Sequence, residues 1–525
     1  MTMTRRAFLE QLGAVGGTTL LLMGLEAFGM GIASAQTAPP PLQGGGSGKK
    51  VVILGAGVAG LTAAYELGKA GYDVTVIEAR SFAGGRSQTA RKGFQLTELG
   101  GETQTCQFDD GYYINHGPWR IPFHHRSTLH YVKEFGVDVE LFNNDNDNSF
   151  MYFTKGSGPL ANKPIRKREV AADMRGNAAE ILAKLTQGGA LDKQMDAGDR
   201  ELFLEYLAAE GYLKGAARTY AGADGRGWIV KPGAGLTPGE EEKPYALTDL
   251  LHSRAWQVLA SISDWDQQRT MFQPKGGMYM LPMGFVTKGG VGEKIRYSTV
   301  VEKIRQNGKG VEVSVVDDKG QKSVVKGDYC ICTIPLSVLK TIDNGLSPKM
   351  KAAMDGAAYA PVGKIGLQMK RRFWEEDHWI YGGHVYTDFS EIGSISLPST
   401  NWLGQKGVLL GYYQFMADAA KVSALSPADR AKFAVDFGQK VFPAYADSFE
   451  NAFSVAWHRV QYNLGGWAMW SEETRARDYP VLLQPDGRLY LAGEHLSYIG
   501  GWQAGGIESA WMQIAALHKR ASAAA

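Results

Sequence analysis

A glycine run directly after a short β-branched segment has the residue types and spacing to bind phosphate. Gly55, Gly57 and Gly60 have the GxGxxG spacing, which allows a tight turn and a close approach of the backbone to a pyrophosphate. The phosphates then lie at the N-terminus of the helix that follows, where free N–H groups and the helix dipole favour negative charge. Glu78 ends the next β-branched segment, in the position that binds ribose hydroxyls. The spacing predicts a site for a dinucleotide.

The elements that position these residues follow from the periodicity of the apolar residues. A strand over 51–54, a helix after Gly60 and a strand over 73–77 make residues 49–99 a βαβ unit. The remaining pattern predicts further elements: helices over 165–220, an exposed loop over 222–244, strands over 296–316, 326–334, 364–370 and 407–415, and a strand, glycine-rich turn and long helix over 488–523.

The composition indicates a large globular protein. The 525 residues are 44% hydrophobic, which is enough for an extensive core. The formal net charge of +2 comes from evenly mixed charges, so we expect no nucleic-acid partner and no membrane-bound surface. Cys106, Cys330 and Cys332 make no disulfide framework, and the last two are expected on one face of a buried strand. No His, Cys or Asp spacing indicates a metal site.

The first 48 residues read as a targeting segment and a linker. Thr4–Leu9 contains an Arg pair, a weakly apolar stretch follows, and Ala33-Ser34-Ala35 is a small-residue cleavage pattern. This order predicts a twin-arginine signal over residues 1–35, and therefore a periplasmic or secreted protein. Glu26 and several glycines interrupt the stretch, so we expect no stable membrane anchor. Residues 36–48 are rich in Pro and Gly and predict a linker.

Several further motifs lie between Glu78 and His495. They are Glu78-Ala79-Arg80, Gly84-Gly85-Arg86, Gly276-Gly277-Met278, Leu281-Pro282-Met283-Gly284-Phe285, Val301-Glu302-Lys303-Ile304 and Leu491-Ala492-Gly493-Glu494-His495. Together these motifs resemble those of the flavin amine oxidase superfamily, over nearly all of residues 49–520. The resemblance implies FAD as the cofactor and a mixed α/β fold, in which a Rossmann-like FAD-binding domain is assembled from discontinuous segments beside a mixed-sheet substrate domain and a helical insertion.

The resemblance also implies the domain boundaries. After the signal and the linker, the FAD-binding domain takes three stretches, the substrate-binding domain two and the helical domain one. The expected ranges are 49–115, 271–340 and 471–525 for the FAD-binding domain, 116–164 and 341–470 for the substrate-binding domain, and 165–270 for the helical domain.

The resemblance assigns the FAD-binding residues. The backbone at Val301 is expected to hold the adenine, and Glu494 to contact the sugar-phosphate chain. The helix after Gly500–Ile507 would point its N-terminus at the flavin and stabilise negative charge there. No cysteine lies beyond Cys332, so we expect non-covalent FAD. The full expected set is Gly55, Gly57, Ala59, Gly60, Glu78, Ala79, Arg80, Gly85, Arg86, Trp119, Arg120, Val301, Gly493, Glu494, Gly501, Trp502 and Gln503.

One short run resembles the L-amino acid oxidase branch of this superfamily. In Gly117-Pro118-Trp119-Arg120-Ile121-Pro122, Arg120 matches the arginine that clamps the substrate carboxylate, and a guanidinium fork suits a carboxylate. The alternative is an arginine paired to a structural acid. A tyrosine of residues 407–415 is expected at the same carboxylate, and Tyr413 is favoured over Tyr412. These two side chains point to opposite faces, so one register step would exchange them.

Two more positions are expected at the substrate. Trp502 matches the aromatic wall beside the flavin, and Trp467 is a second candidate for that wall. Lys364 matches a lysine that holds a water near flavin N5, and a solvated lysine is the alternative. The catalytic set is therefore Arg120, Lys364, Tyr413 and Trp502. The histidines His116, His124 and His125 lie near Arg120 in the sequence, but removal of a hydride from a neutral amine requires no protein base.

The resemblance implies oxidative deamination of L-amino acids to 2-oxo acids, with O2 as the acceptor and ammonia and hydrogen peroxide as products. An L-amino acid 2-monooxygenase, which forms amides, and a polyamine or monoamine oxidase are the alternatives. The expected partners are a small-molecule L-amino acid and O2, and the superfamily commonly forms homodimers. The preferred amino-acid side chain does not follow from the sequence.

Overall fold

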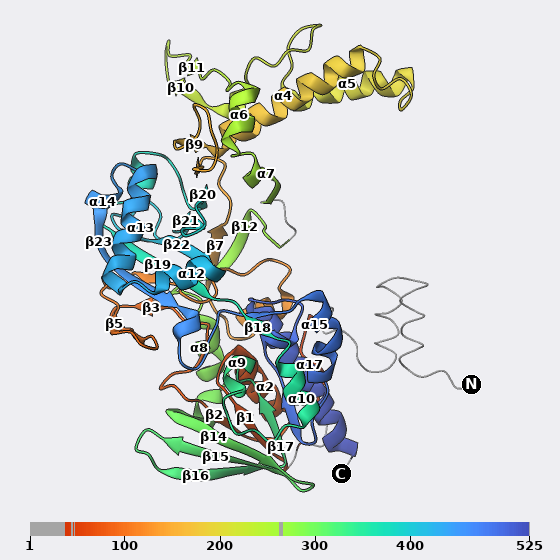
Figure 1. Ribbon diagram of the computed structural model, residues 1–525, viewed down its shortest axis with the longest axis vertical. Helices are drawn as coiled ribbons and strands as arrows, with labels where there is room; N and C mark the ends of the chain where they lie inside the picture. The colour runs from red at the N-terminus through yellow and green to blue at the C-terminus, as the bar shows by residue number, and fades with distance from the viewer. Residues whose placement is uncertain (1–36, 44–45, 47, 262–265, 524–525) are drawn as a thin grey trace.

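The computed structural model describes residues 37–43, 46, 48–261 and 266–523. The twin-arginine signal expected over residues 1–35 lies outside the described residues. The described chain is elongated, with a parallel sheet at one end, a helical arm at the other and a large mixed sheet between them (Figure 1). The mixed α/β fold expected from the sequence is confirmed.

The parallel sheet has five strands, in the order β13-β2-β1-β17-β25. Every neighbouring pair is parallel. The strands come from three stretches of sequence more than 150 residues apart, so the sheet is assembled from discontinuous segments. Their bounds are β1 Lys50–Leu54, β2 Asp73–Ile77, β13 Ile295–Arg296, β17 Tyr329–Cys332 and β25 Leu489–Leu491.

Both faces of the parallel sheet are buried. Val51 and Ile53 of β1 face a core formed with helices α2 (Val58–Lys69) and α17 (Gln503–Ala523). Alternate residues of the sheet, including Cys330 and Cys332, face a second core, which confirms their common face. This second core is completed by an antiparallel sheet of β14 (Thr299–Gln306), β15 (Val311–Asp317) and β16 (Lys322–Gly327), and by α9 (Leu336–Leu339), α10 (Pro348–Met354) and α16 (Tyr479–Leu482).

The large mixed sheet has seven strands, in the order β23-β19-β22-β21-β20-β8-β9. Its pairs are antiparallel except β20 with β8. Helices α12 (Met416–Ser423) and α13 (Pro427–Val441) pack apolar residues against one face. The strand bounds are β8 Phe150–Tyr152, β9 Pro164–Arg166, β19 Val362–Met369, β20 His384–Thr387, β21 Ser394–Ser396, β22 Gly407–Phe415 and β23 Phe449–Ala456.

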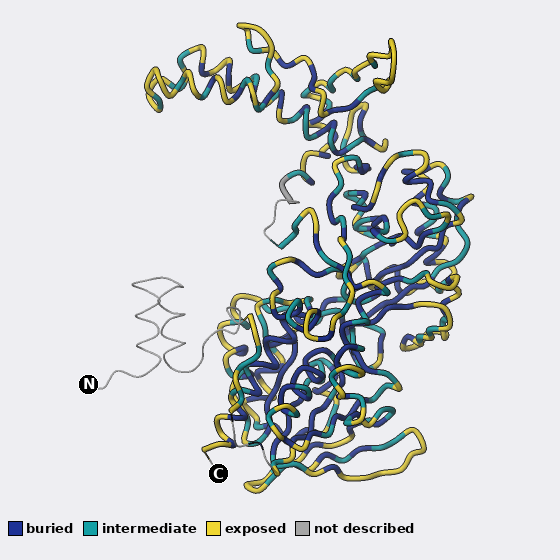
Figure 2. Tube along the Cα trace, turned by 180° about the vertical axis from the view of Figure 1, so that it is seen from behind, coloured by how far each residue is buried: buried dark blue, intermediate teal, exposed yellow. Residues whose placement is uncertain are grey.

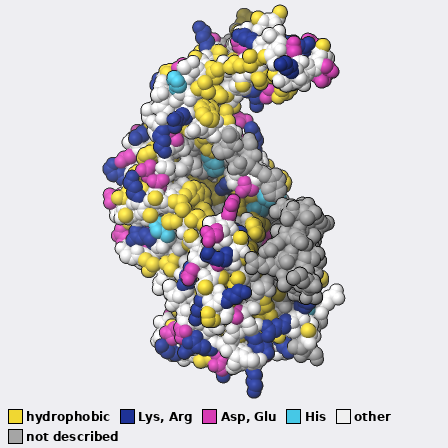
Figure 3. Space-filling model, turned by 45° about the vertical axis from the view of Figure 1, so that its right-hand side comes forward, with side chains coloured by type: hydrophobic (Ala, Val, Ile, Leu, Met, Phe, Trp, Pro, Cys, Tyr) yellow, Lys and Arg dark blue, Asp and Glu magenta, His cyan; other side chains and the backbone are white. Residues whose placement is uncertain are grey.

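The helical arm is built on α4 (Lys167–Gln187) and α5 (Ala197–Gly211), which project away from the two sheets (Figure 1). A small core of Ala and Leu side chains joins them. Exposed residues recur along the whole arm (Figure 2), and hydrophobic side chains lie on its surface (Figure 3). The exposed apolar residues include Ile181, Leu182, Leu185, Leu202 and Tyr206.

The loop expected over 222–244 is mostly exposed but not structureless. It contains a short hairpin of β10 (Trp228–Val230) and β11 (Glu240–Glu241). Its Arg226 is fully buried and forms an ion pair with Asp173 of α4, with Nε 2.7 Å from Oδ1. This buried ion pair stabilises the packing of the 222–244 loop against α4.

The chain returns from the arm through α6 (Leu247–Ser253) and α7 (Gln257–Ser261) to β12 (Thr270–Pro274). This strand pairs antiparallel with β7 (Val139–Asn143), so it lies outside the parallel sheet. Among the described residues, no helix is long and apolar enough to cross a bilayer. The remaining elements near the site are β3 Ala90–Arg91, β4 Gln95–Thr97, β5 Thr103–Thr105, β6 Tyr113–Ile114, α3 Arg126–Glu134 and α8 Met280–Val286.

Candidate functional site

A single large cavity of about 860 Å3 runs from the parallel sheet to the seven-stranded sheet. It begins at the carboxyl ends of β1, β2 and β17, where open α/β sheets bind their ligands. It ends at the side chains of β19 and β22. All of the residues expected to bind FAD or substrate line this cavity except Gly60.

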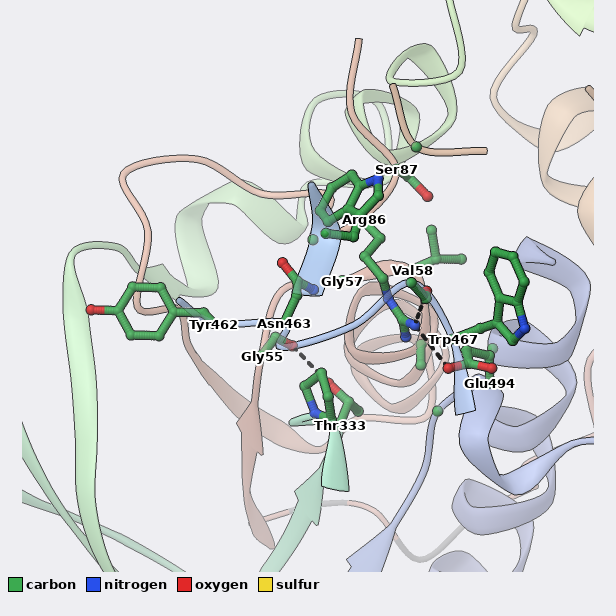
Figure 4. Close-up of a pocket in the computed structure, with 18 of the residues that line it drawn as sticks. Gly55, Gly57, Val58, Arg86, Ser87, Thr333, Tyr462, Asn463, Trp467 and Glu494 are labelled. Atoms are coloured by element: carbon green, nitrogen blue, oxygen red, sulfur yellow. Dashed lines mark hydrogen bonds and ion pairs between the residues drawn. The ribbon is translucent and has the colours of Figure 1, made fainter. Parts of the chain in front are cut away.

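Two glycine loops form a cradle at the sheet end of the cavity (Figure 4). A Cβ added at Gly57 would meet nothing nearer than the Gly85 Cα, at 4.0 Å, so the backbone here is open to a ligand. Gly55 has a φ of 98° and packs against Thr333, whose Oγ1 donates to the Gly55 carbonyl at 3.2 Å. Gly60 has another role, because a Cβ there would lie 1.9 Å from the Gly55 carbonyl oxygen. It allows α2 to pack closely on β1.

Glu78 is fixed at the end of β2 by backbone donors. Its Oε2 accepts from the Ala56 N–H at 2.7 Å and its Oε1 from the Arg80 N–H at 2.9 Å. The side chain is buried but lines the cavity. A carboxylate held in this way has lone pairs left for ligand hydroxyls.

Arg86 and Glu494 join the second glycine loop to the C-terminal segment. Arg86 Nη1 lies 2.8 Å from Glu494 Oε1 and 2.7 Å from the Gly466 carbonyl oxygen (Figure 4). Glu494 also accepts from the Ala468 N–H at 3.1 Å. This ion pair lies at the middle of the cavity and brings together residues 408 positions apart.

The N-terminal end of α17 lines the middle of the cavity through Gln503 and Gly506. The Gln503 Nε2 donates to Ser87 Oγ at 3.1 Å. The Gln503 Oε1 is buried and has no partner among the described residues. The free N–H groups of a helix N-terminus favour an anionic group at this point.

The residues at this end fit a non-covalent dinucleotide such as FAD. The glycine cradle leaves room for phosphates at the start of α2, and Glu78 lies beside it for ribose hydroxyls. The unpartnered Gln503 amide oxygen belongs to a residue that lines the same cavity and would be available to a donor group of the cofactor. The three cysteines are buried elsewhere and none lines the cavity, so no thiol is placed for a covalent link.

Arg120 lines the opposite end of the cavity. Its Nη2 donates to the side-chain oxygen of Gln267 at 2.7 Å, and its Nε is buried without a partner. Among the described residues no carboxylate lies at ion-pair distance from it, which argues against a structural ion pair. Burial lowers the pKa of the Arg120 guanidinium, and nearby Tyr413 opposes that shift. A positive side chain therefore faces the cavity with part of its hydrogen-bonding edge free.

Lys364 lies beside Arg120 on β19 and is almost fully buried. Its Nζ donates to the Gly117 carbonyl at 2.5 Å and lies 4.2 Å from the centre of the Tyr413 ring. Burial lowers the pKa of Lys364 well below its usual range, and the charge of Arg120 lowers it further. Lys364 is therefore not a solvated surface lysine.

A β-bulge determines which tyrosine of β22 reaches the cavity. Ile365 of β19 pairs with Tyr412, but Gly366 pairs with Leu410, so Gly411 is an extra residue. The bulge places Tyr412 in the core under α13 and Tyr413 in the cavity wall. Burial raises the pKa of Tyr413, with Arg120 opposing, so its phenol stays protonated and can donate.

Aromatic rings form the walls around these polar groups. Trp502 lies with its ring centre 5.5 Å from the Arg120 guanidinium carbon and 4.9 Å from the His125 ring. Trp467 lines the other side against Phe415, with the ring centres 5.8 Å apart. Trp119 completes the set. Such walls exclude water from the polar groups between them.

The histidines near Arg120 are not placed as bases in the cavity wall. His116 stacks on Trp457 and burial lowers its pKa to about 3. Burial also lowers the pKa of His125 to about 3, so both rings are neutral. In the part of the chain that is described, no three His, Cys, Asp or Glu side chains are grouped to hold a metal ion.

The sequence pattern missed several lining residues. Thr333 follows β17 directly and lines the cavity. Its place after a predicted buried strand could have indicated a ligand-binding residue, since ligands bind at the carboxyl ends of such strands. Tyr462, Asn463 and Gln267 come from loops with no periodic pattern. Asn463 accepts a hydrogen bond from Arg80, which the motif near Glu78 could not indicate.

The sequence profile of flavin-containing amine oxidoreductases matches residues 58–516. The chain belongs to this family. It is a flavin-dependent oxidoreductase that acts on amine groups.

Named relatives and solved structures agree with the family. The L-amino-acid oxidase of Protobothrops flavoviridis is 27% identical over 485 residues, which cover 86% of each chain. That of Pseudechis australis is 26% identical over 475 residues, covering 88% of this chain and 85% of the relative. Cyclohexylamine oxidase from Brevibacterium oxydans shares the fold with a TM-score of 0.59 at 15% identity, over 90% of this chain and 99% of that chain. Putrescine oxidase bound to putrescine has a TM-score of 0.56 at 18% identity, over 90% and 98%.

Proposed function

We propose that this family member is an FAD-dependent L-amino acid oxidase. The observation that carries the proposal is Arg120, a cavity-facing guanidinium. Among the described residues its buried Nε has no partner, and its one side-chain hydrogen bond goes to a neutral amide. A substrate without a carboxylate would leave this cation uncompensated in a largely apolar pocket, which is costly. The named relatives, which are L-amino-acid oxidases at 26–27% identity, support the proposal.

In this proposal the residues of the chain bind and orient the amino acid. Arg120 binds the carboxylate and the protonated phenol of Tyr413 donates a second hydrogen bond to it. The rings of Trp467 and Trp502 exclude water and hold the amine between them. Lys364 holds a water molecule close to the reacting carbon for hydrolysis of the imine. FAD, when bound, accepts the hydride that leaves Cα and passes the electrons to O2.

The cofactor assignments form the second part of the proposal. The Gly57 and Gly85 loops hold the pyrophosphate, Glu78 the adenosine ribose and the Val301 backbone the adenine. Glu494 and its partner Arg86 contact the sugar-phosphate chain. The start of α17 stabilises negative charge on the flavin. These residues all line one cavity, which supports these roles.

The test is peroxide release by the purified holoenzyme with the twenty L-amino acids, putrescine, spermidine and benzylamine, with the product mass recorded. We expect 2-oxo acids from L-amino acids and no turnover of the amines. Amide products would assign the protein to the L-amino acid 2-monooxygenases instead. Turnover of the carboxylate-free amines alone would contradict the role of Arg120 and assign an amine oxidase.

We also propose export by the twin-arginine route, on the sequence of residues 1–35 alone. Replacing both Arg5 and Arg6 by Lys should leave the protein in the cytoplasm of a bacterial host, because that route requires the arginine pair. Fractionation of the host measures the change. An unchanged distribution between the compartments would contradict the proposal.

A further inference from the structure

In the described part of the chain, Gln267 is the only residue whose side chain forms a hydrogen bond with the Arg120 side chain. Its Oε1 accepts from the Arg120 Nη2 at 2.7 Å, and both residues line the cavity. Gln267 lies between α7 and β12, where the chain returns from the helical arm. Gln267 therefore belongs to a part of the sequence that contains none of the residues expected at the substrate.

The segment that carries Gln267 is bound to the Arg120 loop by several contacts just after Gln267. Ile121 and Phe272 form an antiparallel bridge, with N–H to carbonyl distances of 2.7 and 2.9 Å. Closer to Gln267, the Gln268 Oε1 accepts from the Phe123 N–H at 3.3 Å, and the Gln268 Nε2 lies 3.0 Å from His124 Nδ1. These contacts fix the separation between Gln267 and Arg120.

The neutral partner distinguishes Arg120 from buried arginines with structural roles. The guanidinium groups of Arg226, Arg372 and Arg430 each form an ion pair with a buried carboxylate. An amide oxygen fixes the direction of a guanidinium but carries no net charge, so it leaves the cation free to attract an anion. Asp266 is close enough to act on Arg120 electrostatically, yet it forms no ion pair with it among the described residues.

We propose that Gln267 is a positioning residue for substrate carboxylates: it aims the Arg120 fork into the cavity while leaving its charge for the ligand. This inference rests on the proposed oxidase function and assigns a role to the segment that returns from the arm. A glutamate at the same position would reach the same nitrogen and replace the substrate carboxylate as its counter-ion. In this proposal an amide at position 267 allows Arg120 to bind a substrate carboxylate, whereas the isosteric acid would prevent it.

The experiment compares holoenzymes carrying Gln267→Glu, Gln267→Met and the control Gln187→Glu, which makes the same change on an exposed residue of α4. The probe is benzoate, which has a carboxylate but no amine or oxidisable Cα–H, and its Kd is read from the change in flavin absorbance. KM and kcat are measured with an L-amino acid that the wild-type protein oxidises. FAD content and Tm establish that each variant is folded.

We expect Gln267→Glu to raise the benzoate Kd and the KM by more than about tenfold, with kcat changed by less than about threefold. Gln267→Met should raise both constants by a smaller factor. The methionine no longer orients the Arg120 guanidinium, but it does not neutralise the charge of that group. Gln187→Glu should match the wild type. A purely structural role would instead lower Tm and kcat together and would affect Gln267→Met as much as Gln267→Glu.

Two results separate this inference from the proposed function. If the wild type oxidises L-amino acids and Gln267→Glu binds benzoate as tightly as the wild type, the role of Gln267 is wrong and the oxidase proposal stands. The same conclusion follows if Gln267→Met has the larger effect. If the wild type binds no benzoate and oxidises only carboxylate-free amines, the oxidase proposal itself fails.

Discussion

At the scale of single residues, the positive charge at the Arg120 end of the cavity determines which ligand group it suits. Arg120 and Lys364 place two basic side chains side by side, and no described carboxylate neutralises either of them. Burial favours the neutral form of Lys364, whereas the guanidinium of Arg120 keeps its proton at any working pH. Burial therefore disfavours a second positive charge beside Arg120, and the Arg120 guanidinium suits one carboxylate.

Replacing Arg120 by Lys tests whether the fork matters as well as the charge. The shorter ammonium keeps a positive charge but cannot form two parallel hydrogen bonds with a carboxylate. We expect kcat/KM for L-amino acids to fall on the order of 10- to 100-fold, as the loss of a charge-assisted hydrogen bond implies. Steady-state peroxide assays measure it. Arg175→Lys, at an exposed ion pair on the arm, is the control and should leave kcat/KM unchanged.

At the scale of elements, two glycines at the start of α2 have different roles, one in ligand binding and the other in packing. Gly57 opens to the cavity and Gly60 abuts the Gly55 carbonyl. Gly57→Ala should lower the FAD content of the purified protein with little change in the Tm of the FAD-free form, because the added methyl occupies the space of the phosphates. Gly60→Ala should lower that Tm or abolish folding. FAD absorbance and thermal unfolding distinguish the two, and equal effects of both changes would contradict the division.

The contact between α17 and α3 contains a buried acid whose charge is unfavourable. Burial raises the pKa of Glu508 to about 7, although Ser127 donates to its Oε1 at 2.8 Å. In the unfolded chain the group ionises near its ordinary value of 4.5. Between these two values the folded state holds the proton and the unfolded state does not, so stability falls as the pH rises from about 4.5 through about 7.

Glu508→Gln should remove this dependence, because the amide oxygen still accepts from Ser127 and carries no charge. We expect the variant to be more stable than the wild type at pH 8 by about 1–3 kcal/mol, and equal to it near pH 4.5. Urea unfolding at both values measures the difference. Glu205→Gln, on an exposed position of α5, should show no such gain. A gain of the same size at both pH values would contradict the account.

Sequence patterns predicted those parts of the site that depend on local spacing. The GxGxxG turn, its flanking strands and Glu78 lie within one βαβ unit, so the local chain is enough to place them. The sequence pattern could not decide whether Tyr412 or Tyr413 faces the cavity. The bulge at Gly411 reverses the alternation of faces along β22, and a bulge is not visible in the pattern. Gln267 was missed because a loop carries it, and only the pairing of Ile121 with Phe272 brings it to Arg120.

At the scale of the whole molecule, a buried ion pair joins the first stretch of the chain to the seven-stranded sheet. Arg430 of α13 contacts Glu98 through both terminal nitrogens, at 2.9 and 2.7 Å, and both side chains are buried. Glu98 also accepts from the Ala456 N–H of β23 at 2.7 Å. The pair therefore holds the segment around Glu98 against α13 and β23.

Glu98→Ala should destabilise the protein by about 3–5 kcal/mol, because it leaves the Arg430 charge buried and unpaired. The double variant Glu98→Ala/Arg430→Met should lose less, since neither charge remains. Denaturant unfolding measures both. Lys432→Ala, at an exposed pair with Asp436 on the same helix, should cost less than about 1 kcal/mol. A double variant as unstable as the single one would show that packing, rather than the unpaired charge, is responsible.

The order of strands in the parallel sheet has a consequence for how the protein is made. β25 and α17 complete the sheet and its helical layer, yet they follow all the other strands of this sheet in the chain. Until residue 491 has emerged, β17 has an open edge, and α2 lacks its later partner α17. The FAD-binding domain therefore cannot fold cotranslationally from its N-terminal stretch, and the nascent chain must carry that unpaired edge through the synthesis of more than 150 further residues.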